Sequence, residues 1–121
     1  MTKSSRVSHI LNLIKENNIK FVDFRFTDYR AKWLHISHCA DAIGEEELTK
    51  GVAFDGSSVP AWKEINESDM ILMPDHETAV MDPFTQHPTL ILRCDIHDPY
   101  THRPYLRDPR AVAKRAEEYL R

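Results

Sequence analysis

The sequence predicts an α+β domain, in which a mixed sheet of about five strands is packed with helices. Three observations support this fold class. Apolar residues recur at helical spacing near both ends of the chain, whereas between the ends they alternate in short runs that are typical of strands. Turn-forming residues such as Pro, Asp and Asn separate these runs. A chain of 121 residues is also long enough to bury one hydrophobic core.

A first helix is predicted close to the N-terminus. Its apolar residues occupy the i, i+3, i+4 and i+7 positions of one face, namely Val7, Ile10, Leu11 and Ile14. Ser4 or Ser5 is available as the N-cap, and Asn17-Asn18 provides a stop.

A hairpin is expected after this helix. Apolar residues alternate and share one face of a half-exposed strand: Val22, Phe24 and Phe26. Asp23 and Arg25 would then point to the opposite, exposed face. Residues 27–30 are typical of a turn, and residues 32–37 alternate again, so we expect them to return antiparallel to the first strand.

The middle of the chain mixes one helix with several strands. Residues 40–51 predict a short helix that ends at Gly51, and the segment from there to residue 69 is predicted to be a loop. Three further strands are expected, separated by turns that contain Pro and Asp: residues 70–73, 78–81 and 89–94.

A final helix is predicted to begin with Asp108 as N-cap and Pro109 at its first position, where the missing N–H costs nothing. Its apolar side would consist of Val112, Ala113, Ala116 and Leu120. Because no glycine or proline follows before Arg121, we expect the helix to continue in a longer protein. The chain is accordingly divided into a domain at 1–107 and the start of a connecting helix at 108–121.

Composition argues against several classes of partner. The net charge is −3 and no dense block of Lys and Arg occurs, so nucleic acid is not an expected partner. Apolar runs are far shorter than the roughly 20 residues of a membrane-spanning helix, and no signal peptide is visible, so a cytoplasmic location is expected. Cys39 and Cys94 are expected to be reduced thiols.

Neither common nucleotide-binding loops nor a metal site is expected. With three glycines, the chain contains no G-x-x-x-x-G-K-[ST] loop and no G-x-G-x-x-G turn. His35 and His38 would point to opposite faces of a strand, and no second matched pair completes a tetrahedral site with Cys39 or with Cys94 and His97.

The segment from Gly51 to Asp69 is the candidate functional region. Taken alone, Asp55-Gly56-Ser57-Ser58 is a polar turn whose side chains bond the local backbone. A turn needs neither the nearby Trp62 nor the Ile-Asn-Glu-Ser-Asp string at 65–69, and long ordered loops often carry function.

Motifs along nearly the whole chain resemble, in order and spacing, the N-terminal domain of bacterial-type glutamine synthetases. They include Phe54-Asp55-Gly56-Ser57-Ser58, Trp62-Lys63, residues 65–70, Leu72-Met73-Pro74-Asp75, Asp82-Pro83-Phe84, Arg93-Cys94-Asp95-Ile96, Arg107-Asp108-Pro109-Arg110 and residues 113–117, with Phe21-Val22-Asp23 and residues 25–28 further upstream. The resemblance implies a β-grasp fold. It also implies that ATP, glutamate and divalent metal ions, Mg or Mn, are bound by a larger C-terminal domain beyond Arg121, so that this piece alone is inactive and binds no cofactor.

The resemblance further implies a double hexameric ring, in which the N-terminal domain of one subunit closes the active site of the next. Asp55 would hold ammonium and help to remove its proton before attack on γ-glutamyl phosphate. A carboxylate suits this role because it attracts the cation and can act as a base in a site partly closed from water. The resemblance also implies that Ser58 and Trp62 are substrate-binding residues that line the same interface, with Trp62 near the nucleotide.

The sequence departs from the family pattern at two places. Val59-Pro60-Ala61 replaces a glycine-rich stretch, and because proline fixes φ near about −65° this loop should be stiffer. Tyr29-Arg30-Ala31 lacks the glycine of the family's first hairpin turn. Two alternatives to the ligase remain: a related γ-glutamyl ligase that uses another amine, and a free-standing β-grasp interaction module.

Overall fold

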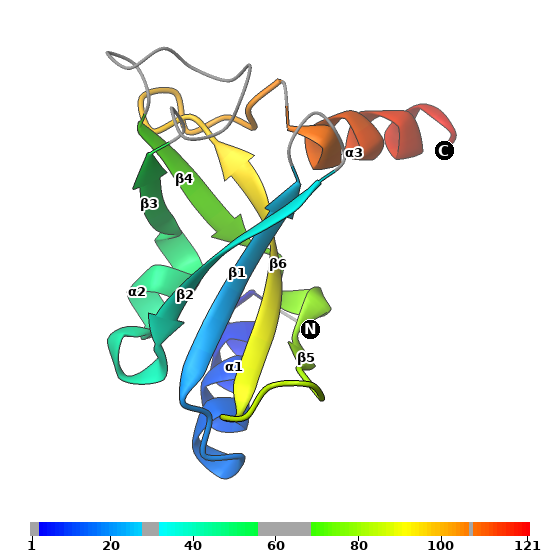
Figure 1. Cartoon of the computed structure of the whole chain (residues 1–121). Coiled ribbons are helices and arrows are strands. Elements are labelled where there is room, and N and C mark those ends of the chain that lie inside the picture. The colour runs from blue at the N-terminus through cyan, green and yellow to red at the C-terminus, as the bar shows by residue number, and fades with distance from the viewer. Residues whose placement is uncertain (1–2, 28–31, 56–68, 107) are drawn as a thin grey trace.

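A single mixed sheet, with helices packed against it, forms the body of the molecule. The computed structural model describes residues 3–27, 32–55, 69–106 and 108–121. Its helices are α1 (Lys3–Glu16), α2 (Glu45–Lys50) and α3 (Pro109–Tyr119), with short 3-10 turns η1 (Ala40–Ala42) and η4 (His76–Thr78). Its strands are β1 (Phe21–Thr27), β2 (Trp33–Cys39), β3 (Val52–Asp55), β4 (Asp69–Pro74), β5 (Val80–Met81) and β6 (Thr89–His97). Figure 1 shows α1 and α2 behind the sheet and α3 extending from one end of it.

The sheet order is β2-β1-β6-β4-β3, and the short β5 pairs with β6. The hairpin of β1 and β2 is antiparallel, as predicted, while β1 and β6 form the parallel pair at the centre. Phe24 therefore has Ile36 on one side and Leu92 on the other. The antiparallel pairs β4–β6 and β3–β4 complete the sheet. The predicted α+β class is confirmed, and the described residues contribute six strands to the sheet.

Alternating residues of the strands bury the face that α1 covers. The fully buried side chains of this core include Ile10, Val22, Phe24, Leu48, Met70, Leu72, Leu90, Leu92 and Ile96. Val7 and Ile10 are buried, and Leu11 and Ile14 pack against the core, so the predicted apolar face of the first helix is confirmed. The helix begins at Lys3, however, so Ser4 and Ser5 lie within it and neither is the N-cap.

Three elements of the middle region differ from the sequence prediction. Residues 40–51 form the turn η1 and the six-residue helix α2, which ends at Gly51 as expected. The strand expected at 78–81 shrinks to β5, because the Thr78 hydroxyl donates to the Asp75 carbonyl and closes η4. Residues 52–55 were expected in a loop but form β3. This strand escaped prediction because four residues are too few to show an alternating pattern.

The backbone of Gly51 explains how β3 begins. Its φ is 91°, a conformation that favours glycine, and a Cβ built there would lie 2.7 Å from the Leu72 carbonyl oxygen. A side chain at this position would therefore strike β4. Gly51 lets the chain leave α2 and enter the sheet within one residue.

Two expectations about exposure are wrong. Asp23 was expected on an exposed face, yet it is 5% exposed because side chains of β1 and β2 surround its carboxylate. The expected apolar side of α3 is exposed as well, with Val112 at 50% and Leu120 at 83%. The polar side of α3 faces the sheet, and within this helix Ala111 is the buried residue. No helix within the described ranges is long and apolar enough to cross a membrane.

Candidate functional site

The sequence-predicted site residues lie at one margin of the sheet or outside the described residues. Asp55 is the last residue of β3, where its backbone pairs in antiparallel register with Asp69 at the start of β4. Ser58 and Trp62 belong to residues 56–68, which lie outside the described part of the chain. Of the turn expected at 27–30, Thr27 is the last residue of β1, and the other three residues also lie outside the described part.

The position of β3 leaves Asp55 at the side of the molecule. β3 is the last strand in the sheet order, and among the described strands its neighbour is β4. Phe54 anchors the strand, because its ring lies 5.0 Å from that of Phe26 on β1. Figure 1 shows that β3 ends at the same end of the sheet from which α3 departs.

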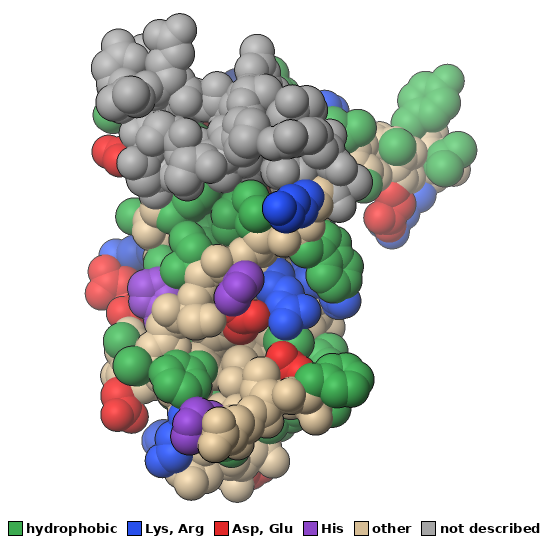
Figure 2. Space-filling view, in the orientation of Figure 1, with side chains coloured by type: hydrophobic (Ala, Val, Ile, Leu, Met, Phe, Trp, Pro, Cys, Tyr) green, Lys and Arg blue, Asp and Glu red, His purple; other side chains and the backbone are tan. Residues whose placement is uncertain are grey.

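The face of the sheet opposite α1 carries a network of charged side chains. Asp23 is its most buried member, and one carboxylate oxygen accepts from the Ser37 hydroxyl at 3.0 Å and contacts His35 Nδ1 at 2.7 Å. The other oxygen accepts from Arg25 Nε at 3.0 Å. Asp82 lies 3.5 Å from Nη2 of the same guanidinium, so two carboxylates hold Arg25 in place. Figure 2 shows acidic, basic and histidine side chains mixed across this face.

A second cluster fastens α3 to the sheet. Arg110 donates from Nε to Asp95 at 2.9 Å and from Nη2 to Asp75 at 2.7 Å. Lys114, one turn further along α3, bonds the other oxygen of Asp95. Burial alone would raise the pKa of Asp95, but the hydrogen bonds from Lys114 and Arg110 outweigh burial and lower it.

Asp108 joins the same region from inside the protein. As predicted, it is the N-cap of α3 and accepts from the backbone N–H of Arg110 at 3.1 Å. Its other oxygen accepts from the backbone N–H of Ile96 at 2.9 Å. Burial raises the pKa of its carboxyl from 3.8 to about 6, although both N–H donors act in the opposite direction.

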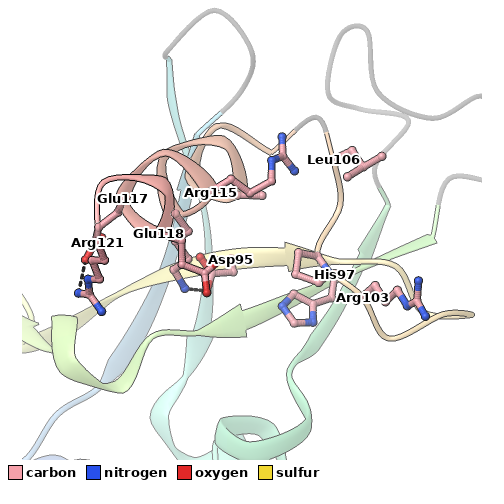
Figure 3. A pocket seen from close by; sticks show the side chains of 11 residues that line it. Asp95, His97, Arg103, Leu106, Arg115, Glu117, Glu118 and Arg121 are labelled. Atoms are coloured by element: carbon pink, nitrogen blue, oxygen red, sulfur yellow. Dashed lines mark hydrogen bonds and ion pairs between the residues drawn. The ribbon is translucent and has the colours of Figure 1, made fainter.

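A cavity of about 650 Å³ lies beneath α3. Figure 3 shows β6 and the following loop on one side of it and α3 on the other. Both acidic and basic side chains line it, and an ion pair joins Arg121 to Glu117. Burial lowers the pKa of His97 in its wall. These mixed charges favour neither a cationic nor an anionic ligand.

A smaller cavity of about 190 Å³ lies on the charged face of the sheet, near the N-terminus of α3. It is lined by Arg25, Phe26, Thr27, Trp33, Arg93 and Arg110. The cavity was not predicted from the sequence. A signal was present, since Arg25 and Arg93 each alternate with core residues, but only the pairing of β1 with β6 places the two arginines together.

The histidines and cysteines take other positions. His35 and His38 lie on opposite faces of β2, as predicted, where His35 contacts Asp23 and His38 packs edge-on against Phe24 at 5.5 Å. Cys39 and Cys94 are free thiols. The described residues contain no group of three His, Cys, Asp or Glu side chains arranged to hold a metal ion.

Comparisons with known proteins give one consistent result. A family model described as "Glutamine synthetase, beta-Grasp domain" matches residues 18–99. The glutamine synthetase of Vibrio cholerae serotype O1 is 56% identical over 115 residues, covering 95% of this chain and 24% of the relative. That of Methylococcus capsulatus is 56% identical over 112 residues, covering 93% and 24%.

A solved structure shares the fold. The cryo-EM structure of Plasmodium falciparum glutamine synthetase superposes with a TM-score of 0.83 at 23% identity, covering 93% of this chain and 22% of that one. The chain therefore spans about a quarter of the length of the relatives that it matches.

Proposed function

Because the chain belongs to the family of glutamine synthetase β-grasp domains, we propose that it serves as the N-terminal domain of a glutamate–ammonia ligase. Such an enzyme makes glutamine from glutamate and ammonia, with ATP hydrolysis, through γ-glutamyl phosphate. The observation that carries the proposal is the family match over residues 18–99, together with 56% identity to a bacterial glutamine synthetase.

In this proposal Asp55 acts on ammonium at a site shared with a neighbouring subunit. Its carboxylate attracts the cation and accepts one proton from it. The lone pair of the resulting ammonia attacks the carbonyl carbon of γ-glutamyl phosphate. The C–O bond to phosphate then breaks, and the nitrogen gives a second proton to the departing phosphate, so that the amide of glutamine remains. The place of Asp55 at the end of the outermost strand supports the proposal, because a second subunit can approach the sheet from that side. Ser58 and Trp62 are proposed to line the same interface.

The remaining chemistry is assigned to a larger domain. ATP, glutamate and Mg or Mn ions would be bound there, and residues 108–121 would lead toward it. We propose that the assembled protein is a double hexameric ring in the cytoplasm, with one β-grasp domain closing each neighbouring site. The firm attachment of α3 by Arg110 and Lys114 suits a connection that must hold two domains at a fixed angle.

A chimera tests this function. This chain would replace the matching 115 residues of the Vibrio cholerae enzyme, and glutamine formation would be measured with ATP, glutamate and ammonium. We expect an oligomer of the parent's size that retains activity. A chimera that assembles with the parent's size but forms no glutamine would contradict the proposal.

The role of Asp55 is tested in the active chimera. We expect Asp55→Ala to lower ammonium-dependent turnover about 100-fold or more, the usual contribution of a general base, while ATP binding is retained. Asp41→Ala, a change at an exposed aspartate of η1, is the matched control and should leave turnover unchanged. Near-normal turnover of Asp55→Ala at low ammonium would remove Asp55 from the mechanism. Preferential use of methylamine over ammonium would instead indicate an amine ligase.

A further inference from the structure

Three arginine side chains converge on one small cavity of the charged sheet face. Arg25 reaches it from β1, Arg93 from β6 and Arg110 from α3, while Thr27 adds a hydroxyl. No carboxylate occurs among the described residues that line this cavity. The surface that a ligand would meet is therefore cationic, although the protein as a whole carries a net charge of −3.

Two of these arginines stand side by side. Arg25 and Arg93 are register partners in the parallel pair of β1 and β6, and neighbouring strands lie only about 4.8 Å apart. Their side chains therefore leave the same face of the sheet from adjacent positions. A single anion in the cavity that both side chains line could accept hydrogen bonds from both guanidinium groups.

Carboxylates behind the cavity hold two of the arginines without occupying it. Asp23 and Asp82 fix Arg25, and Asp75 and Asp95 fix Arg110. These contacts use Nε and Nη2 of each guanidinium, whereas a guanidinium has five N–H donors. Each guanidinium therefore has N–H donors beyond those that bond these described carboxylates, and the ion pairs restrict its position, so binding an anion would order few additional groups.

Arg93 differs from the other two. Its guanidinium lies 5.4 Å from the centre of the Trp33 ring, and no carboxylate in the described part of the chain pairs with it. Trp33 is 59% exposed, so this stacked pair forms an accessible wall of the cavity. Stacking on an aromatic ring leaves the edge of the guanidinium, with its N–H groups, free to bind a ligand.

We propose that this cavity binds a small oxyanion, with the phosphate group as its preferred ligand. Arginine forks match the oxygen geometry of phosphate, and charge-assisted hydrogen bonds from several of them add in strength. A volume of about 190 Å³ accepts a phosphate group and little more. The ligand would bridge β1, β6 and α3. Asp55 is not among the described residues that line this cavity, and the proposal does not depend on the proposed ligase activity.

Inorganic phosphate is the probe for the test. It would be titrated into the 121-residue chain at constant ionic strength, balanced with sodium chloride, while Trp33 fluorescence is recorded in a Trp62→Phe background. We expect a saturable change, and a melting temperature higher by about 5 °C at ten times the dissociation constant. Glycerol phosphate as a second titrant distinguishes free phosphate from a phosphate ester.

Substitutions at Arg93 test whether the phosphate binds in this cavity. Arg93→Gln should weaken phosphate binding by about 10-fold or more, because it removes a charged hydrogen-bonding group. The phosphate affinity of Arg93→Lys should lie between those of Arg93→Gln and the parent chain. Arg103→Gln changes an exposed arginine outside this cavity and is the matched control. Equal responses to phosphate and chloride, or equal affinities in Arg93→Gln and the parent chain, would overturn the proposal. Binding of a glutamate-rich peptide but not of phosphate would also overturn it and indicate a protein partner.

Discussion

Asp108 shows how one buried carboxylate can make stability depend on pH. Its pKa of about 6 lies above its ordinary value of 3.8, so between these values the folded protein binds the proton more readily than the unfolded chain. The contribution of Asp108 to the free energy of unfolding is therefore full below about pH 4 and declines as the pH rises through 6. At 1.36 kcal/mol per pKa unit, the loss is on the order of 3 kcal/mol.

We predict that Asp108→Asn removes this decline. The amide cannot ionise, although its NH2 group cannot accept from the Ile96 N–H and lowers stability by a constant amount at every pH. Urea unfolding at pH 4 and pH 7 would measure the effect. The difference in unfolding free energy between the variant and the parent chain should shift in favour of the variant by on the order of 3 kcal/mol from pH 4 to pH 7. Parallel pH profiles for the two chains would contradict the assignment, and Asp41→Asn provides the control at an exposed aspartate.

Gly51 gives a second prediction at the residue scale. Gly51→Ala places a Cβ against the Leu72 carbonyl and the Ile71 side chain at a φ of 91°. We expect a loss of about 2 to 4 kcal/mol in unfolding free energy, from backbone strain and overpacking. Gly44→Ala is the matched control, because its Cβ would lie 3.5 Å from the nearest atom. Equal losses for both variants in urea unfolding would show that the contact with β4 is unimportant.

The attachment of α3 can be examined at the element scale. The hydrogen bonds from Lys114 and Arg110 lower the pKa of Asp95 against the opposing effect of burial. Because the folded-state pKa lies below 3.8, this carboxylate contributes stability above that pH and loses it as the pH falls. Asp95 and Asp108 therefore act in separate, successive pH ranges.

We predict that Lys114→Met raises the pKa of Asp95. The substitution keeps the length of the side chain but removes the charge and the hydrogen bond. An NMR titration of the Asp95 carboxyl carbon would measure the change. Lys50→Met alters an exposed lysine on α2 and should leave the pKa of Asp95 where it is. An unchanged pKa in Lys114→Met would mean that the contact has no role in solution.

Individual elements were predictable from sequence to different degrees. Alternation revealed β1 and β2, and Asp108-Pro109 fixed the start of α3. Helical spacing could not show which side of α3 meets the sheet, because Arg110 and Lys114 reach Asp95 through ion pairs rather than through apolar contact. The motif around Asp55 was visible locally. The arginine cavity was not, because it depends on strands that are distant in sequence.

At the scale of the whole molecule, one hydrophobic core extends from α1 across strands β1, β6, β4 and β3. Phe24 lies at its centre between Ile36 and Leu92. We predict that Phe24→Ala lowers the unfolding free energy by about 3 to 5 kcal/mol, since the cavity it leaves cannot fully close. Urea unfolding would measure this loss. Phe84→Ala, at a side chain that is 93% exposed, should cost less than about 0.5 kcal/mol, and a similar cost for both would argue against a shared core.

The parallel pair of β1 and β6 cannot form during synthesis until β6 has left the ribosome. Phe21 pairs with Thr89, which leaves the ribosome 68 residues later (89 minus 21). At about 5 to 20 residues per second, the first hairpin waits roughly 3 to 14 seconds for its central partner. During this interval the apolar side of β1 has α1 but no β6 beside it. The newly made chain therefore exposes an apolar surface for a limited time. A chaperone that binds in that interval would protect the domain from aggregation before β6 completes the sheet.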